Sequence, residues 1–331
     1  MKNVNVGVKA PIADAVPRKF ENPDLTAKGE RRAIVGLTRL DTLWINTGTL
    51  CNITCQNCYI ESSPSNDRLV YISVAEATAY LDEIRDLGLS TREIAFTGGE
   101  PFLNPDMLAM TEAALARGFE VLILTNAMQP MQRPAIKKGL LALGERHGKR
   151  LKLRVSLDHH GKALHESERG ARTWAKALAG IDWLVEHGFN VAIAGRTCWN
   201  ESEADSRAGY ARLIAERGWP IAPGDQSQLH LLPEMDGKPD VPEISVGCWK
   251  ILGKRPSDMM CATSRMVVKR KGAPTPVVVP CTLLPYEPEF EMAATLAQSM
   301  QANGRMFANG AVKLCHSHCA KFCVLGGGSC S

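Results

Sequence analysis

The chain lacks the segments that would place it in a membrane or export it. No apolar run among its 331 residues approaches the roughly 20 residues that span a bilayer. The N-terminus has no apolar core of the kind found in signal peptides. The net charge of +4 is too small to indicate a nucleic-acid or anionic-membrane partner. We therefore expect a soluble, cytoplasmic protein that binds neither nucleic acid nor a membrane.

Cysteine, by contrast, is abundant, with 11 residues. Three lie at Cys51, Cys55 and Cys58, Cys198 is isolated, and seven fall between 248 and 330. In the reducing cytoplasm, clustered thiols are more often metal ligands than disulfide partners. The distribution therefore predicts metal ligation.

Short apolar runs alternate with helical patterns from residue 41 to 235. The predicted strands are 42–46, 93–97, 120–125, 152–157, 190–194 and 228–232. A capping box at Ser73 and Glu76 predicts a helix start. Five residues share the apolar face of that helix: Ala77, Tyr80, Leu81, Ile84 and Leu87. Further helices are predicted at 105–117, 134–147, 171–187 and 203–217. Glycines suited to end the helical segments follow them at Gly88, Gly118, Gly148, Gly188 and Gly218.

This alternation predicts an α/β fold with a parallel sheet and right-handed crossovers. Six strands are too few for a complete eight-stranded barrel, so we expect a partial (β/α)6 TIM-type barrel over residues 41–235. Residues 1–40 read as an irregular lead-in. Residues 236–331, rich in proline, glycine and cysteine, are expected to form a small metal-stabilised domain.

The most informative motif is Cys51-x3-Cys55-x2-Cys58, directly after the first predicted strand. Three thiolates can hold three irons of a four-iron cluster and leave the fourth iron open to a small molecule. Zinc or buried free thiols would be the simpler alternative. The spacing resembles the radical S-adenosylmethionine (SAM) superfamily, in which SAM binds the open iron. Asn57 departs from that family, which often has an aromatic residue there.

The second predicted strand ends in Thr97-Gly98-Gly99-Glu100. The two glycines permit close backbone approach to a ligand, and Glu100 adds a carboxylate. Alone, such a sequence would fit any turn. At this position it resembles the family's GGE motif, which implies contact with the amino group of SAM.

Other strand ends carry candidate side chains for the same cofactor. By the same resemblance, Thr125 and Ser156 could bind the ribose or carboxylate of SAM, although both could equally cap the following turn. Arg196 could pair with the SAM carboxylate or face solvent. His159 and His160, after the fourth strand, could hold substrate or move protons, or simply be solvated. No catalytic residue is assigned.

The cysteine-rich tail predicts a second metal region. Its cysteines are Cys248, Cys261, Cys281, Cys315, Cys319, Cys323 and Cys330. The stretch 261–281 is expected to form a hairpin with a cysteine at each end. The tail resembles the SPASM or twitch extension of radical SAM enzymes, which implies one or two auxiliary four-iron clusters.

Seven tail cysteines fall one short of two complete ligand sets. An iron could be open, or Cys198, His316 or His318 could supply the missing ligand, or some thiols could be spare. Zinc would also suit these ligands.

The resemblance implies reductive cleavage of SAM to a 5′-deoxyadenosyl radical that abstracts hydrogen from a small molecule or a peptide. Auxiliary clusters would support oxidation or bond formation, and a flavodoxin- or ferredoxin-type donor would supply electrons. The lead-in is too short for a separate leader-peptide-binding domain, which favours a small molecule or a peptide delivered by another protein. Alternatives are a sulfur-inserting or group-transfer radical enzyme and a zinc-binding scaffold.

Overall fold

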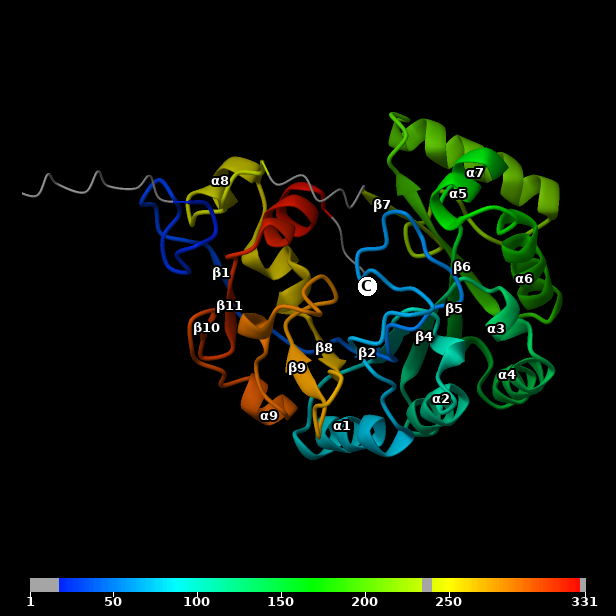
Figure 1. Ribbon diagram of the computed structural model, residues 1–331, viewed down its shortest axis with the longest axis horizontal. Helices are drawn as coiled ribbons and strands as arrows, with labels where there is room; N and C mark the ends of the chain where they lie inside the picture. The colour runs from blue at the N-terminus through cyan, green and yellow to red at the C-terminus, as the bar shows by residue number, and fades with distance from the viewer. Residues whose placement is uncertain (1–17, 234–239, 328–331) are drawn as a thin grey trace, which may run out of the picture.

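The structure is a computed structural model that describes residues 18–233 and 240–327. An eight-stranded sheet has the order β7-β6-β5-β4-β3-β2-β8-β9, and a three-stranded sheet has the order β1-β11-β10 (Figure 1). The strands are β1 (Ile34–Val35), β2 (Thr42–Asn46), β3 (Glu93–Thr97), β4 (Glu120–Thr125), β5 (Leu151–Ser156), β6 (Asn190–Thr197), β7 (Leu229–Pro233), β8 (Ser264–Val268), β9 (Val277–Val279), β10 (Phe307–Ala308) and β11 (Ala311–Lys313).

The larger helices lie on the convex side of the eight-stranded sheet (Figure 1). The α-helices are α1 (Val74–Asp86), α2 (Met107–Ala116), α3 (Gln129–Gln132), α4 (Pro134–His147), α5 (Lys162–Arg169), α6 (Trp174–Glu186), α7 (Glu203–Arg217), α8 (Cys248–Leu252) and α9 (Leu296–Ser299). Short helical turns complete the set: 3-10 turns η1 (Pro101–Leu103), η2 (Gly148–Arg150), η3 (Pro256–Asp258), η4 (Met260–Ala262) and η5 (Pro288–Phe290), and a π-helix, η6 (Cys319–Leu325).

The predicted partial barrel is confirmed. β2 to β7 are parallel neighbours in sequence order, and helices connect them. The capping box at α1 is present, with Ser73 accepting from the Glu76 N–H and Glu76 accepting from the Ser73 N–H. One residue of its predicted apolar face is wrong, because Leu87 lies just beyond the last turn and is 42% exposed.

The sheet continues into the tail, which the βα rhythm does not predict. β8 pairs in parallel with β2, and β9 pairs antiparallel with β8, which forms the expected hairpin between Cys261 and Cys281. The pairing of β8 with β2 joins segments more than 200 residues apart, so no local pattern reveals it. The predicted boundary at 236 stays a prediction, but the sheet itself extends across it. Among the described strands, no ladder joins β7 to β9, so the barrel is open.

The two faces of the sheet have separate cores. On β2, Leu43 and Ile45 pack with the helices, whereas Trp44 packs with residues of the tail. This follows from the alternation of side chains along a strand. The lead-in is fixed to the tail side by Arg32, whose buried guanidinium pairs with Glu243 at 2.5 Å and donates to the carbonyl of Leu314. In the part of the chain that is described, no helix is long and apolar enough to cross a bilayer.

Candidate active site

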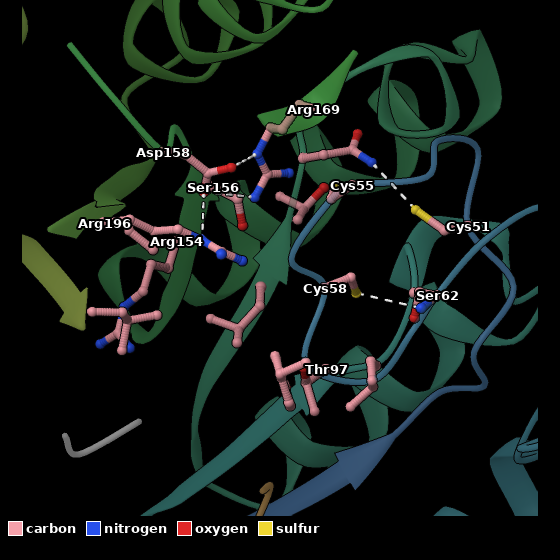
Figure 2. Close-up of a pocket in the computed structure, with 18 of the residues that line it drawn as sticks. Cys51, Cys55, Cys58, Ser62, Thr97, Arg154, Ser156, Asp158, Arg169 and Arg196 are labelled. Atoms are coloured by element: carbon pink, nitrogen blue, oxygen red, sulfur yellow. Dashed lines mark hydrogen bonds and ion pairs between the residues drawn. The ribbon is translucent and has the colours of Figure 1, made fainter. Parts of the chain in front are cut away.

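One cavity at the carboxyl ends of the strands gathers most of the predicted site residues (Figure 2). Its volume is about 160 Å³. The predicted residues in its wall are Cys51, Cys55, Cys58, Thr97, Gly98, Gly99, Thr125, Ser156 and Arg196. The cysteines come from the loop after β2, and the others lie at the ends of β3, β4, β5 and β6. Parallel strands bring these ends to one mouth because they all point the same way.

The glycine pair has a clear packing role. A Cβ on Gly98 would lie 2.4 Å from the carbonyl oxygen of Gly48, and one on Gly99 would lie 2.2 Å from that of Leu50. The Gly99 N–H donates to Gly48 and the Glu100 N–H donates to Leu50. The glycines therefore let the start of the cysteine loop pack on the end of β3. Both also line the cavity, so their predicted contact with SAM stays a prediction.

Glu100 is buried behind the cavity wall. Its carboxylate accepts the Thr125 hydroxyl at 2.8 Å, the Asn126 N–H at 2.8 Å and the Phe102 N–H at 3.3 Å. Burial raises the pKa of Glu100 to about 7, although these hydrogen bonds oppose the shift. The side chains of Glu100 and Thr125 are thus hydrogen-bonded to each other in this structure. Their predicted contact with SAM is not tested by it.

Buried ion pairs also line the cavity. Asp158 accepts two hydrogen bonds from Arg169, at 2.7 and 3.0 Å, and lies 3.6 Å from Arg196. Burial opposes ionisation of Asp158, but Arg169 and Arg196 together hold its pKa below the usual value. Arg196 also lies 3.4 Å from a carboxylate oxygen of Glu168. The predicted SAM-binding Arg196 therefore has protein partners on several sides.

The cysteine thiols suit a metal better than free thiols. Burial raises the pKa of Cys51 to about 12 and that of Cys55 to about 11. Without a cation such thiols stay protonated, whereas a cluster binds the thiolate form. Two neighbouring N–H groups already point at the sulfurs: Ser62 N–H lies 3.3 Å from Cys58 Sγ, and Asn126 Nδ2 lies 4.0 Å from Cys51 Sγ. Three thiols that line one cavity beside amide donors fit the ligand set of an iron–sulfur cluster.

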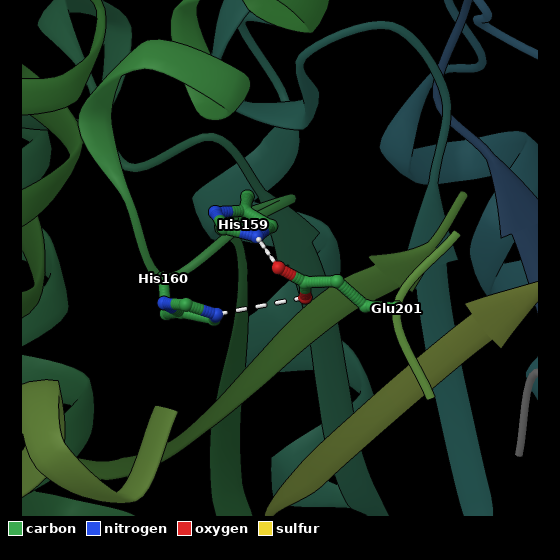
Figure 3. A group of neighbouring side chains, drawn as sticks. All are labelled: His159, His160 and Glu201. Carbon is green, nitrogen blue, oxygen red and sulfur yellow. Dashed lines mark hydrogen bonds and ion pairs between the residues drawn. The ribbon is translucent and has the colours of Figure 1, made fainter. Parts of the chain in front are cut away.

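The two predicted histidines form a closed polar group beside the cavity (Figure 3). The Gly161 N–H donates to His159 Nδ1, so the neutral ring carries its proton on Nε2 and donates it to Glu201 at 3.1 Å. His160 Nε2 lies 3.6 Å from the other carboxylate oxygen, to which Ser206 also donates. The two histidines thus interact with Glu201, and neither of them lines the cavity. The predicted role of His159 and His160 toward substrate stays a prediction.

Four of the tail cysteines surround a second, smaller cavity, of about 10 Å³: Cys261, Cys281, Cys319 and Cys323. Cys315 lies apart, with its thiol against the carbonyls of Phe20 and Asn22. Cys248 receives the Ser245 N–H on its sulfur. Cys330 lies outside the described residues. Cys198, His316 and His318 line neither cavity.

Several site residues escape prediction from the sequence. Asp158 and Arg169 form a buried ion pair that lines the cavity, and Glu168 lies behind it beside Arg196. α5, which carries Glu168 and Arg169, is a short, largely charged helix without an apolar period. The available signal was the run from Ser156 through Arg169 and Gly170, which resembles the fourth unit of radical SAM enzymes but assigns no contacts.

Comparisons with known sequences agree with this arrangement. The radical SAM superfamily description matches residues 45–205. The antilisterial bacteriocin subtilosin biosynthesis protein AlbA of Bacillus subtilis (strain 168) is 30% identical over 145 residues, which cover 44% of this chain and 30% of AlbA. The chain thus spans well under two thirds of the length of the curated relatives it matches.

Two solved structures have a similar fold. Streptococcus suis SuiB bound to precursor peptide SuiA has a TM-score of 0.58 at 13% identity, covering 91% of this chain and 73% of SuiB. Native anSMEcpe with bound AdoMet has a TM-score of 0.57 at 16% identity, covering 79% of this chain and 80% of that one. At these identities the likeness establishes the fold alone.

Proposed function

We propose that the chain, whose residues 45–205 match the radical SAM superfamily, is an enzyme of that family that cleaves SAM reductively and turns the resulting radical on a bound substrate. The observation that carries the proposal is the single cavity lined by all three motif cysteines and by the ends of four parallel strands. A four-iron cluster on Cys51, Cys55 and Cys58 would supply the electron that splits SAM into methionine and a 5′-deoxyadenosyl radical, which removes hydrogen from substrate.

The protein itself would bind and orient SAM. Thr97 and Ser156, which carry hydroxyls, line the cavity together with Gly98 and Gly99. These groups are the proposed contacts of the amino and carboxylate groups of SAM. Glu100, held by Thr125 and Asn126, would support the glycine turn from behind. A polar wall that is already hydrogen-bonded holds such contacts in place before the ligand arrives.

The proposed substrate is a peptide or a small molecule. AlbA is named for the biosynthesis of a bacteriocin, and SuiB was solved with a precursor peptide, which supports a peptide. The cavity wall also includes the apolar side chains of Leu283 and Phe322 from the tail. A substrate placed there would lie between the motif cysteines and the tail cysteines. A flavodoxin- or ferredoxin-type electron donor stays a prediction.

An auxiliary cluster on Cys261, Cys281, Cys319 and Cys323 is part of the proposal. Four thiols around one cavity make a complete ligand set. The surroundings of Arg265 favour a negatively charged group between these four cysteines. Arg265 is fully buried, its guanidinium donates only to the carbonyls of Cys261, Ser264 and Gly310, and no carboxylate among the described residues pairs with it. Four thiolates on a metal would supply the missing negative charge.

Anaerobic reconstitution with iron and sulfide tests the function. We expect the reconstituted protein to bind at least one four-iron cluster and to form 5′-deoxyadenosine from SAM with dithionite. Zinc in place of iron, with no 5′-deoxyadenosine, would instead support a zinc-bound scaffold. Loss of cluster sulfide during turnover with substrate would favour the sulfur-inserting alternative.

A further inference from the structure

Asn57 lies between two motif cysteines and is held on several sides by distant residues. Its backbone N–H donates to one carboxylate oxygen of Glu168 at 2.9 Å, and its side-chain amide donates to the other at 2.9 Å. The neighbouring Gln56 N–H donates to the backbone carbonyl of Glu168 at 2.8 Å. One residue at the end of α5 therefore takes three hydrogen bonds from the segment between Cys55 and Cys58.

Arg196 completes the arrangement from the other side of the peptide. Its Nη2 donates to the carbonyl of Asn57 at 2.9 Å, while its Nη1 lies 3.4 Å from Glu168. Both charged side chains are buried: that of Glu168 is 3% exposed and that of Arg196 is 10% exposed. Buried charge-assisted hydrogen bonds are stronger than neutral ones, and losing one partner leaves an unpaired charge. The pair is therefore well placed to fix the local backbone.

We infer that Glu168 is a positioning residue for the radical cluster and acts through Asn57, with Arg196 bridging the two. The inference deepens the proposed function and rests on it, because it needs a cluster on Cys55 and Cys58. Its physical content is that the carboxylate fixes the backbone between two ligands, so their sulfurs stay at the spacing that one cluster requires. An amide at position 57 matches this acceptor, whereas a phenylalanine would have no donor for the second carboxylate oxygen.

The test measures how fast iron leaves the anaerobically reconstituted protein when an iron chelator is added. The barrel-cluster phase is identified by its absence from a triple variant in which Cys51, Cys55 and Cys58 are alanine. Glu168→Ala should accelerate that phase by about tenfold, as removal of an outer hydrogen-bond partner typically weakens metal binding. Iron release from the tail cysteines should not change.

Exchanging the hydrogen-bonding groups makes the test specific. Asn57→Asp sets two carboxylates against each other and should accelerate release, whereas Asn57→Asp combined with Glu168→Gln restores a donor–acceptor pair and should slow it again. Glu112→Gln is the matched control, because that carboxylate forms an ion pair with Arg146 far from the cavity. It should release iron at the wild-type rate. If Glu168→Ala fails to fold, the comparison of Asn57→Asp with the double variant still tests the inference.

Two results would overturn the inference. One is a wild-type release rate in both Glu168→Ala and Asn57→Asp. The other is a double variant whose release is as fast as the sum of its single effects. Failure of the proposed function looks different, because the wild-type protein would then hold no cluster or form no 5′-deoxyadenosine. The electron paramagnetic resonance spectrum of the reduced protein, recorded with and without SAM, separates cluster loss from weaker SAM binding in each variant.

Discussion

The two groups of cysteines differ in number, spacing and surroundings. The barrel group has three thiols in one loop and opens on a cavity of about 160 Å³ that is lined by charged and hydroxyl side chains together with many apolar ones. The tail group has four thiols from three separate segments around about 10 Å³, with Met259, Leu284 and Leu314 among the lining residues. A site that lacks one ligand and has room beside it can bind a reactant, whereas a complete, closed site favours structure or electron transfer.

The charges beside the two groups differ as well. In the barrel, Arg169 is neutralised by the carboxylate of Asp158. In the tail, burial lowers the pKa of Arg265, and the nearby thiols Cys261 and Cys281 are the groups that favour its charged form. The charges of the barrel site are thus paired by protein groups, while the proposed tail site would need a bound metal to supply the negative charge. This difference predicts that losing metal destabilises the tail more than the barrel.

The largest expected effect comes from breaking the barrel group. Cys55→Ala removes one of three ligands, so formation of 5′-deoxyadenosine should fall to the background rate. The iron content should fall by one cluster, because two thiolates no longer hold it. Cys198→Ala is the control, since that thiol lines neither cavity. Substantial SAM cleavage by the Cys55→Ala protein would contradict the assignment of this loop.

A second substitution tests whether the tail group is independent. Cys319→Ala should remove the tail cluster and leave SAM cleavage without substrate close to the wild-type rate. Cys315→Ala removes a cysteine only four residues away whose thiol contacts the lead-in carbonyls rather than the four-thiol cavity. It should keep the iron that Cys319→Ala loses. Equal iron loss in the two variants, measured by metal analysis, would contradict the proposed set of four cysteine ligands.

The contrast also shows what the sequence can predict. The barrel strands and the three-cysteine loop follow from local patterns, since a βα unit and a short motif each lie within a few dozen residues. The grouping of tail cysteines depends on β8 pairing with β2 and on η6 lying near the β8–β9 hairpin, which are contacts between distant segments. α5 is not predicted from the sequence because it is only eight residues long and has two apolar residues, too few to reveal a helical period.

The glycine pair teaches a related point. Two glycines at a strand end predict close approach of the backbone to a ligand. In the structure, the backbone of Gly48 and Leu50 lies against them, and the contact with a ligand stays a prediction. Sequence reasoning cannot separate a ligand from the protein's own loop, because both require the same missing Cβ.

The charge difference leads to a prediction whose sign depends on the metal. In the metal-free protein, Arg265→Met removes a buried cation that has no carboxylate partner among the described residues but also its hydrogen bonds to the carbonyls of Cys261, Ser264 and Gly310, so the net gain in the free energy of unfolding should be about 1 kcal/mol. In the metal-loaded protein the same change removes a favourable partner of the thiolates, so the gain should vanish or reverse. Arg32→Met is the control, because it strands the buried carboxylate of Glu243 and should destabilise both forms. Anaerobic urea unfolding with and without prior chelation measures the change in unfolding free energy for both variants in both forms. An equal gain for Arg265→Met in the two forms would argue against compensation of its charge by metal-bound thiolates.

The last expected effect compares one buried histidine from each region. Burial lowers the pKa of both His165 and His316 to about 4. Each ring therefore stays neutral when folded but takes a proton near pH 6.5 when unfolded, so its contribution to stability is complete above 6.5 and is lost as the pH falls toward 4. By linkage, one such histidine costs about 2 kcal/mol between pH 7.5 and pH 5.

The two replacements should nevertheless behave differently. No ring nitrogen of His165 has a hydrogen-bond partner among the described residues, so His165→Phe should abolish its share of the acid sensitivity at little cost near pH 7.5. His316 Nδ1 accepts the His318 N–H, so His316→Phe should lose stability at pH 7.5 by leaving that amide without its acceptor. Thermal unfolding of both variants across this pH range decides the matter. An unchanged pH dependence in His165→Phe would mean that this ring is already protonated in the folded barrel and has a partner there.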